Sequence, residues 1–279
     1  MGSEVVLVTG CSSGIGRAAA KAFVAHGHTV YATARHVGSL DALASQGCRA
    51  LVIDVTDEES MARAVGTIER EHGSIDVLVN NAGYGQQGAV EETSIDLFRS
   101  QFETNVFGAV RLCQLVLPAM RRRGRGRIVM VSSMGGRLTF PGGAAYHASK
   151  YALEAISDVL RFEVAKFGIS VVVVEPGLVA TDYGTAALHR LAGDAAAGPY
   201  AAVTVGGSAA LENSFSGGVE GTSTAEEVAA AIVAAATDAT PRSRYVVGAM
   251  AEQLLAMRQQ LADPEWDAMM ASMYVQPEP

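Results

Sequence analysis

The segment Tyr146–Lys150, with the sequence YHASK, places a phenol and an ammonium group at a spacing that suits proton transfer. If this segment is helical, Tyr146 and Lys150 lie one turn apart on the same face. Lysine is scarce in the chain, which holds only Lys21, Lys150 and Lys166. An ammonium group fixed beside a phenol makes the phenol a usable proton donor near neutral pH. The pair therefore predicts acid–base chemistry on a carbonyl or an alcohol.

A glycine-rich turn, Thr9–Gly16 with the sequence TGCSSGIG, follows a predicted strand and opens a predicted helix. Glycines at such a junction let the backbone approach a pyrophosphate, whose charge the helix N-terminus stabilises. A glycine-rich turn alone is a weak motif, but this position in the chain strengthens it. The predicted dinucleotide contacts of the turn are Gly10, Ser12, Ser13, Gly14, Ile15 and Gly16.

The end of the second predicted strand bears on the choice of cofactor. An NAD site usually has Asp or Glu there, to accept a hydrogen bond from the adenosine 2′-hydroxyl. The segment 31–36 has no acid at this point and supplies Arg35, which can pair with a 2′-phosphate, while Ser13 can donate a hydroxyl to the same group. The alternative is that Arg35 merely begins a surface loop in an arginine-rich chain. The missing carboxylate favours NADP(H) over NAD(H).

Two further strand ends are candidates for adenosine contacts. Asp54, followed by Val55, ends the third predicted strand and either accepts a hydrogen bond from the adenine amine or caps the helix that starts near Asp57. The NNAG segment, Asn80–Gly83, ends the fourth predicted strand. It either packs against the adenosine or forms an ordinary turn. The cofactor residues predicted here are Asp54, Val55, Asn81, Ala82 and Gly83.

Short β-branched apolar runs alternate with helical patterns along the chain. This alternation predicts βαβ units with right-handed crossovers. The predicted fold is α/β, a Rossmann-type doubly wound parallel sheet of about seven strands with helices on both faces. The predicted strands are Val5–Thr9, Thr29–Thr33, Ala50–Ile53, Val77–Asn80, Arg127–Ser132, Ile169–Glu175 and Arg244–Val247. The predicted helices are Ile15–His26, Val37–Gln46, Asp57–His72, Ile95–Arg123, Ala144–Phe167 and Ala225–Thr237.

The fifth predicted strand brings hydroxyl groups to the same edge of the sheet as the glycine-rich turn. Ser132 and Ser133 end that strand, and open α/β sheets bind ligands at the carboxyl ends of their strands. Tyr146 and Lys150 begin the next helix, thirteen residues beyond Ser133. Serines at a strand end are often caps, and a tyrosine and a lysine one turn apart are often a helix surface. Their combination with a dinucleotide turn favours a catalytic site.

Length and composition predict one catalytic domain, 1–279, in the cytoplasm. The chain has 279 residues, of which 49% are hydrophobic, enough for a sizeable core. A net charge of −8 argues against a nucleic-acid partner. The three cysteines are scattered without metal-ligand spacing, so we expect no metal site, no disulfide frame and a reducing compartment. We also expect no signal peptide and no membrane span.

Two segments depart from this pattern. The segment 183–222, rich in Gly, Ala and Ser, is either a lid over the substrate site or an insertion with poorly patterned helices. The basic run Arg121–Arg127 resembles a nucleic-acid patch, but cations and a glycine are also what ends a long helix. We interpret this basic run as a solvated helix end.

Taken together, the motifs resemble those of the short-chain dehydrogenase/reductase family in its single-domain branch. The resemblance covers roughly the first 180 residues and agrees in spacing as well as in motif. The matching residues are TGCSSGIG (Thr9–Gly16), NNAG (Asn80–Gly83), Asn105, Ser133, YHASK (Tyr146–Lys150) and PGLVAT (Pro176–Thr181).

The resemblance implies that Tyr146 is the general acid in reduction and the base in oxidation. A free phenol has a pKa near 10, so Lys150 and the oxidised nicotinamide must favour the tyrosinate. Lys150 would also hydrogen-bond the nicotinamide ribose, which a broad, planar arginine would do poorly. Ser133 would hold the substrate oxygen, and Asn105 would anchor a water that links Lys150 to solvent. The implied nicotinamide contacts, beside Tyr146 and Lys150, are Pro176, Gly177, Val179 and Thr181.

The function that follows is an NADP(H)-dependent interconversion of a carbonyl and a primary or secondary alcohol by hydride transfer. The alternative is a catalytically silent NADP-binding sensor or scaffold, which need not keep all four of Asn105, Ser133, Tyr146 and Lys150. An epimerase or dehydratase is disfavoured, because such relatives generally carry a differently spaced glycine turn.

A softer resemblance, to the hydroxysteroid and retinol dehydrogenase subgroup, concerns the substrate. It implies a small, lipophilic ketone, aldehyde or alcohol, in a pocket flanked by 84–86, 138–142 and parts of 183–222. The family resemblance also implies a homodimer or homotetramer built on the helices Ile95–Arg123 and Ala144–Phe167.

Overall fold

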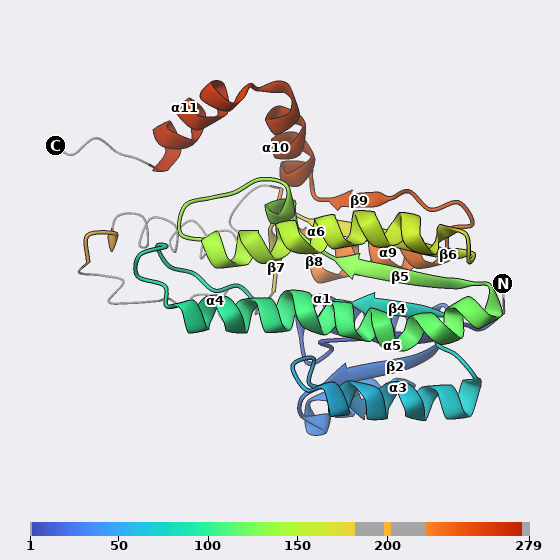
Figure 1. The fold of residues 1–279 in the computed structure, drawn as a ribbon. Helices are drawn as coiled ribbons and strands as arrows, with labels where there is room; N and C mark the ends of the chain where they lie inside the picture. The colour runs from blue at the N-terminus through green and yellow to red at the C-terminus, as the bar shows by residue number, and fades with distance from the viewer. Residues whose placement is uncertain (1, 182–197, 202–220, 275–279) are drawn as a thin grey trace.

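A computed structural model of the chain describes residues 2–181, 198–201 and 221–274 (Figure 1). The strands are β1 (Val5–Val8), β2 (Thr29–Ala34), β3 (Arg49–Val52), β4 (Val77–Asn80), β5 (Gly126–Val131), β6 (Ile169–Pro176), β7 (Val179–Ala180), β8 (Ser223–Thr224) and β9 (Arg244–Val247). The helices are α1 (Gly14–Ala25), α2 (Asp41–Ala44), α3 (Glu58–His72), α4 (Ile95–Phe102), α5 (Gly108–Arg123), α6 (Ala144–Ala165), α9 (Ala225–Thr237), α10 (Ala249–Gln260) and α11 (Asp263–Tyr274).

Seven of these strands form one parallel sheet in the order β3-β2-β1-β4-β5-β6-β9. The winding direction reverses between β1 and β4, which lie side by side. Ligands of such sheets bind beyond the carboxyl ends of the strands at this reversal point. The predicted doubly wound fold with about seven strands is confirmed. The short pair β7 and β8 forms a separate two-stranded sheet that the sequence did not predict.

Both faces of the sheet are covered by helices. One apolar cluster joins the sheet to α1 and α9, and a second joins its other face to α3, α5 and α6. Alternate residues of β1 supply the two clusters: Val6 and Val8 belong to the first and Leu7 to the second, and all three are fully buried. Figure 1 shows α3, α5 and α6 lying across the same face. This two-faced burial explains why the strands are continuous apolar runs.

Two predicted helices differ from the structure. The predicted helix Val37–Gln46 is a 3₁₀ turn, Val37–Leu40, followed by the four-residue α2. Gly38 and Ser39 at its start are poor helix formers, which accounts for the shorter element. The predicted helix Ile95–Arg123 is interrupted between α4 and α5 by a π-helical turn, Glu103–Phe107.

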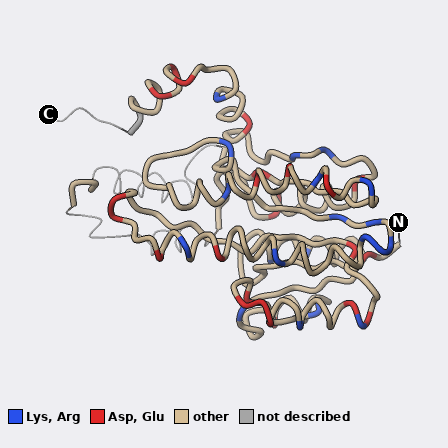
Figure 2. The backbone as a smooth tube through the Cα atoms, in the orientation of Figure 1, with Lys and Arg blue, Asp and Glu red and all other residues tan. Residues whose placement is uncertain are grey.

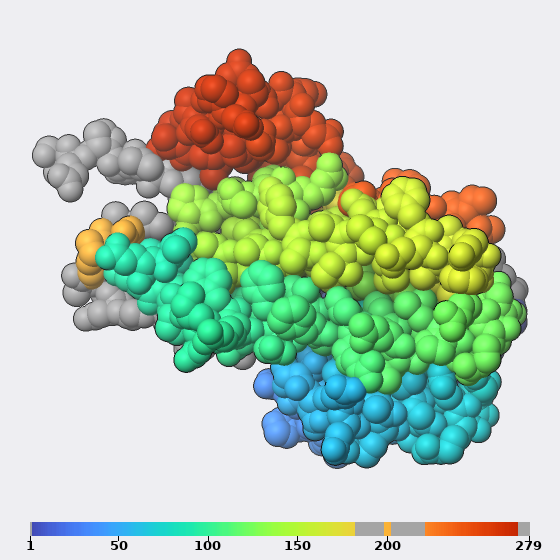
Figure 3. Space-filling model, in the orientation of Figure 1, coloured from blue at the N-terminus to red at the C-terminus, as the bar shows by residue number. Residues whose placement is uncertain are grey.

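The C-terminal helices α10 and α11 were not predicted, because their apolar residues do not recur at a clean helical spacing. They project from the body of the molecule (Figure 3). Ala251, Leu255 and Trp266 of these helices form a third apolar cluster with Met134 and Leu138, which follow β5. The C-terminal helices are therefore anchored on the segment between β5 and α6.

The basic run Arg121–Arg127 lies at the end of α5, close to the N-terminus (Figure 2). Gly124 adopts a left-handed conformation (φ +66°) and ends the helix. Arg123 and Arg125 both pair with Asp76, at 2.8 and 3.4 Å. These contacts confirm the interpretation as a helix end.

The predicted lid, 183–222, lies outside the described residues except for 198–201 and 221–222. Within the part of the chain that is described, no helix is long and apolar enough to cross a membrane.

Candidate functional site

The glycine-rich turn is shaped by close backbone approaches that exclude side chains. Gly10 and Gly14 have φ values of +72° and +53°, which favour glycine. A Cβ on Gly16 would lie 2.4 Å from the Gly10 carbonyl oxygen. Helix α1 begins at Gly14 with no acidic residue in its first turn, and its N-cap residue Ser13 makes no side-chain capping bond. The helix N-terminus and the Ser13 hydroxyl therefore suit a phosphate ligand.

The NNAG segment is held against this turn by Thr9. The Thr9 hydroxyl accepts hydrogen bonds from the backbone N–H groups of Asn81 and Ala82, at 3.0 and 2.9 Å. The Asn81 side chain donates to the Thr9 carbonyl in return, at 2.8 Å. The glycine-rich turn after β1 and the NNAG segment after β4, both predicted to contact the cofactor, therefore lie side by side where the winding direction reverses. This linking role of Thr9 was not predicted, although its place at the start of the glycine motif was a signal.

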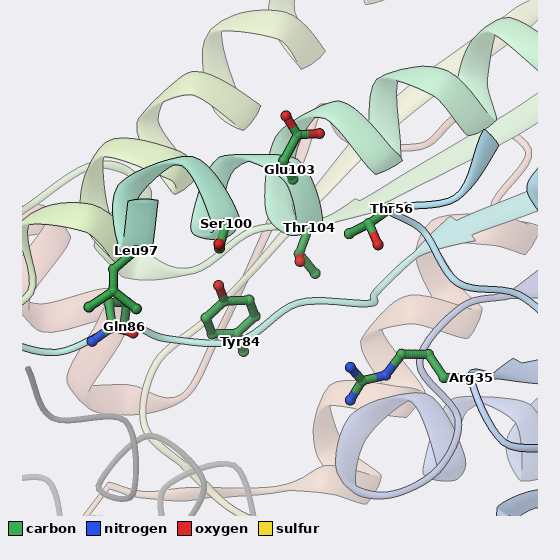
Figure 4. Close-up of a pocket in the computed structure, with 8 residues that line it drawn as sticks. All are labelled: Arg35, Thr56, Tyr84, Gln86, Leu97, Ser100, Glu103 and Thr104. Atoms are coloured by element: carbon green, nitrogen blue, oxygen red, sulfur yellow. The ribbon is translucent and has the colours of Figure 1, made fainter. Parts of the chain in front are cut away.

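Arg35 is exposed just beyond β2 and forms no ion pair with any of the described residues. It lies at one end of a cavity of about 510 Å³ that continues along the loop after β4 and along α4 (Figure 4). The guanidinium group is therefore available to an anionic ligand. The residues that line the cavity are Arg35, Thr56, Tyr84, Gln86, Leu97, Ser100, Glu103 and Thr104.

The capping alternative for Asp54 is wrong. Asp57 is the N-cap residue of α3 and accepts a hydrogen bond from the Ser60 backbone N–H at 3.2 Å. Asp54 Oδ1 instead accepts hydrogen bonds from the backbone N–H and the hydroxyl of Thr56, at 3.0 and 2.8 Å. Asp54 and the buried Val55 thus shape the turn that brings Thr56 to the cavity.

The PGLVAT segment passes beside both the glycine-rich turn and Ser133. The nearest atom to a Cβ built on Gly14 is Thr181 Cγ2, at 3.4 Å. The Pro176 carbonyl oxygen accepts a long hydrogen bond of 3.4 Å from Ser133 Oγ. Gly177 and Val179 lie between these two contacts along the chain. The residues predicted for the nicotinamide end are thus placed between the glycine-rich turn and the strand end that carries Ser133.

Tyr146 and Lys150 lie in the first two turns of α6, as their spacing predicts. Tyr146 is half-buried, whereas Lys150 is buried, with Nζ 5.8 Å from the centre of the Tyr146 ring. Lys150 Nζ donates a hydrogen bond of 2.9 Å to the Val131 carbonyl at the end of β5. Burial lowers the pKa of Lys150 to about 8, against an opposing effect of the Glu154 charge. The hydrogen bond to Val131 thus holds the Lys150 ammonium group close to the Tyr146 ring.

Ser133 borders the same loop as the Tyr146 ring. It is buried, and its Oγ accepts a hydrogen bond of 3.0 Å from the Gly135 backbone N–H. A Cβ on Gly135 would lie 3.3 Å from Cε1 of Tyr146. Ser133 and Tyr146 therefore flank one short turn at the carboxyl edge of the sheet.

Asn105 lies in the π-helical turn and is fully engaged with its neighbours. Its Oδ1 accepts a hydrogen bond from the Tyr84 backbone N–H at 3.0 Å, and its Nδ2 donates to the Tyr84 carbonyl at 2.9 Å. The same Nδ2 lies 3.1 Å from Ser149 Oγ, next to Lys150 in the sequence. The side chain therefore joins the loop after β4 to α6. This is the backbone-binding role that an asparagine within a helix commonly has.

An ionic network built on two buried carboxylates, Glu154 and Glu175, lies beside the site and was not predicted from the sequence. Arg244 Nη2 lies 2.7 Å from both carboxylate oxygens of Asp158 and 3.1 Å from Glu154 Oε2. Its Nε lies 3.0 Å from Glu175 Oε1, and Arg137 contacts the other Glu175 oxygen at 3.3 Å. Glu175 is fully buried. The network ties β6, β9 and α6 to the turn that follows β5.

We expect an Arg244→Met variant to lose about 3 kcal/mol of unfolding free energy, because Glu154 and Glu175 would remain buried without their shared cation. Burial raises the pKa of both carboxyls, while Arg244 opposes that rise. A carboxyl whose pKa is raised on folding begins to cost stability above its ordinary pKa, and the cost is complete above the raised pKa, so the loss should be larger at about pH 8 than at about pH 5. Urea denaturation at both pH values measures it.

The matched control for this experiment is Arg99→Met. Arg99 pairs with Asp96 at 2.8 Å, but both side chains are exposed. Exposed pairs contribute at most about 1 kcal/mol. Equal losses in the two variants would contradict the buried network.

Comparison with known proteins shows the family to which the chain belongs. The family model for short chain dehydrogenase matches residues 4–191. A 3-ketodihydrosphingosine reductase of Bacteroides thetaiotaomicron is 41% identical over 181 residues, which cover 63% of this chain and 64% of that protein.

Solved structures extend the similarity beyond the motif region. A short-chain dehydrogenase from Streptomyces avermitilis is 38% identical, with a TM-score of 0.81 over 97% of this chain and 99% of that one. A serine dehydrogenase in its closed form, complexed with NADP+, is 25% identical, with a TM-score of 0.76 over 88% of this chain and 95% of that one. With its parallel sheet, glycine-rich turn and Ser133–Tyr146–Lys150 arrangement, the chain belongs to the short-chain dehydrogenase family of oxidoreductases.

Proposed function

We propose that the protein is an NADP(H)-dependent oxidoreductase that interconverts a carbonyl and a primary or secondary alcohol. The observation that carries the proposal is the gathering of Ser133, Tyr146 and Lys150 at the carboxyl edge of the sheet, beside the glycine-rich turn. The bound nicotinamide supplies or accepts the hydride. Support for the cofactor comes from the glycine-rich turn and the N-terminus of α1, whose backbone suits a pyrophosphate.

Proton transfer is assigned to Tyr146. In reduction its hydroxyl gives a proton to the oxygen that becomes the alcohol, and in oxidation its phenolate takes that proton back. The buried Lys150 ammonium stabilises the phenolate between these events. Ser133 Oγ binds the same substrate oxygen, which can replace its long 3.4 Å bond to Pro176. These roles together give the site one proton donor, Tyr146, and a second hydrogen-bond donor, Ser133, for the reacting oxygen.

Asn105 takes a supporting place in this scheme. Its side chain is occupied by Tyr84 and Ser149, so it holds the loop after β4 against the helix that carries Tyr146 and Lys150. The water-mediated relay from Lys150 to solvent stays a prediction of the family resemblance.

NADP(H) is favoured over NAD(H) by the surroundings of Arg35. No carboxylate ends β2, Arg35 is exposed without an ion-pair partner among the described residues, and the Ser13 hydroxyl caps nothing. The adenosine is proposed to lie against Asp54, Val55, Asn81, Ala82 and Gly83. The similar serine dehydrogenase structure contains NADP+.

We expect an Arg35→Ala variant to bind NADPH about 10- to 100-fold more weakly and NADH almost unchanged. A charge-assisted hydrogen bond to a phosphate contributes about 1.5–3 kcal/mol, and NADH lacks the 2′-phosphate. Fluorescence titration with each cofactor measures the effect. Arg63→Ala, which removes an exposed charge on α3, is the control. Equal weakening of both cofactors by Arg35→Ala would refute a 2′-phosphate contact.

A lipophilic substrate and a homo-oligomer complete the proposal. Leu138 and Phe140 are apolar residues on the segment between Ser133 and Tyr146, and a similar protein is named 3-ketodihydrosphingosine reductase. Phe107, Val159 and Phe162 are exposed on and beside α5 and α6, where a second copy would cover them. We propose that residues 1–279 form one catalytic domain.

The decisive experiment is a panel of ketones, aldehydes and alcohols, followed by the absorbance of NADPH. Turnover of lipophilic carbonyls with NADPH supports the proposal. Tight NADPH binding without turnover of any compound would favour the silent sensor or scaffold instead. Turnover with NADH alone would contradict the cofactor assignment.

A further inference from the structure

His147, the residue that follows Tyr146, is buried with both ring nitrogens engaged. The Phe140 backbone N–H points at Nε2, at 3.1 Å. A backbone N–H can only donate, so Nε2 must be the unprotonated acceptor. The proton therefore sits on Nδ1, which donates to the Gly135 carbonyl at 2.9 Å. The backbone thus fixes a neutral imidazole in its Nδ1–H tautomer.

The imidazole fills a slot formed by two glycines. A Cβ on Gly135 would lie 2.8 Å from Nδ1 of His147, and a Cβ on Gly143 would lie 2.7 Å from its Cδ2 and Nε2. The rings of Phe140 and Tyr146 pack against it, with centroids 5.7 and 5.6 Å away. Side chains at either glycine would expel the ring. The two glycines, which the sequence analysis did not interpret, are explained by the histidine.

The His147 ring holds the segment 135–143, which lies between Ser133 and Tyr146 in the chain. It starts at Gly135, carries Leu138 and Phe140, and returns to α6 at Gly143. The Gly142 carbonyl accepts a hydrogen bond of 2.8 Å from the Gly88 backbone N–H. The segment therefore also supports the loop after β4, which supplies Tyr84 and Gln86 to the cavity. The two segments proposed to flank the substrate pocket, 84–86 and 138–142, therefore both depend on the position of residues 135–143.

We propose that His147 is a positioning residue that sets the shape of the substrate pocket by holding residues 135–143 against α6. The proposal rests on the proposed function, because the pocket is defined by the site around Ser133 and Tyr146. Both nitrogens are occupied, so His147 takes no part in proton transfer despite its place beside Tyr146. Its effect is on substrate binding and not on the chemical step.

Protonation of His147 would undo this arrangement. An imidazolium would present an Nε2–H to the Phe140 N–H, so two donors would face each other. Burial lowers the pKa of His147, against a weaker opposing effect of the Gly135 carbonyl. The titratable group packed against the ring is Tyr146, and the nearest charged residues along the chain are Lys150 and Glu154. Among the described residues no carboxylate pairs with the ring to stabilise an imidazolium.

The test compares His147→Phe and His147→Asn with wild type. Phe keeps an aromatic ring but loses both hydrogen bonds, and Asn keeps a short donor for Gly135. We expect the KM for the best carbonyl of the panel to rise about tenfold in His147→Phe and less in His147→Asn. The kcat and the NADPH dissociation constant should stay within about threefold. His26→Phe, at the exposed end of α1, is the control for an added phenylalanine.

The pH profile separates positioning from general damage. In wild type the KM should rise as the pH falls below about 6, the range in which imidazole gains a proton. In His147→Phe the KM should be high and flat over the same range. A loss confined to kcat, an unchanged KM, or an NADPH affinity that falls as much as the KM rises would each overturn the proposal.

The tautomer is measurable without any substrate. Imidazole ¹⁵N chemical shifts of wild type at neutral pH should show a protonated Nδ1 and an unprotonated Nε2. An Nε2–H tautomer or an imidazolium would overturn the proposal even if the variants failed to fold. If no compound in the substrate panel is turned over, the proposed function fails. The measured tautomer of His147 still tests whether this side chain holds residues 135–143.

Discussion

The Tyr146→Phe variant is expected to bind NADPH within about threefold of wild type and to turn over carbonyl substrates about 10²- to 10⁴-fold more slowly. The change removes one oxygen from a half-buried ring and leaves the glycine-rich turn and Arg35 in place. Without that hydroxyl, no group at this position on α6 gives the proton to the substrate oxygen. Steady-state kinetics and NADPH fluorescence on the same sample separate the two effects.

Tyr151→Phe is the matched control, since Tyr151 lies on the same helix and is exposed. We expect wild-type kinetics from it. Turnover by Tyr146→Phe at more than about a tenth of the wild-type rate would remove Tyr146 from the proton-transfer role. A parallel collapse of NADPH binding would mean that the phenol serves the cofactor and not the reaction.

The Lys150→Met variant is expected to lose turnover and to gain stability in the cofactor-free protein. At pH 7 the gain in unfolding free energy should be about 1–3 kcal/mol, because one pKa unit corresponds to about 1.4 kcal/mol. Burial lowers the pKa of Lys150 from 10.5 to about 8, so the folded protein carries a charge that it disfavours. Methionine fills the same buried path without that charge. Urea denaturation and an activity assay on one preparation test both halves.

The sign of the pH dependence follows from the lowered pKa. Below pH 8 the lysine is charged in the folded and the unfolded state, and its full cost is present. Between pH 8 and 10.5 the folded protein loses the proton first, so wild-type stability rises relative to the variant. The difference should vanish near pH 11. Lys21→Met, at an exposed position of α1, should show no such change. A variant less stable than wild type at pH 7 would contradict this account.

The fold was predictable because its central strands, β1, β4, β5 and β6, are buried on both faces and are continuous apolar runs in the sequence. The boundaries of α9, β4 and β9 agree with the predicted ones, and most others differ by one or two residues. Of the candidate site, Tyr146 and Lys150 were predictable from a single helical spacing, and Ser133 from its place after a strand. The glycine-rich turn was predictable because its backbone conformation and close contacts require glycine at fixed positions. This requirement appears in the sequence as a recognisable motif.

The remaining contacts depend on residues that are far apart in the sequence. Nothing near Arg244 indicates that it lies between Glu154 and Glu175, because the three residues belong to different elements. Asn105 in the π-helical turn bonds to Tyr84, which lies 21 residues earlier, and such a contact leaves no periodic pattern in the sequence. The orientation of His147 depends on two glycines that read as ordinary loop residues.

The π-helical turn at Glu103–Phe107 gives the α4–α5 stretch two angular phases. Each residue of an α-helix is rotated by about 100° from the one before it, and a π-helical turn inserts one additional residue. Gln101, before the insertion, accepts a hydrogen bond from Gln86 and donates one to Tyr84 in the loop after β4. Leu112, after it, is buried against the sheet. A single stretch of chain thus presents one side to the substrate loop and a differently rotated side to the core.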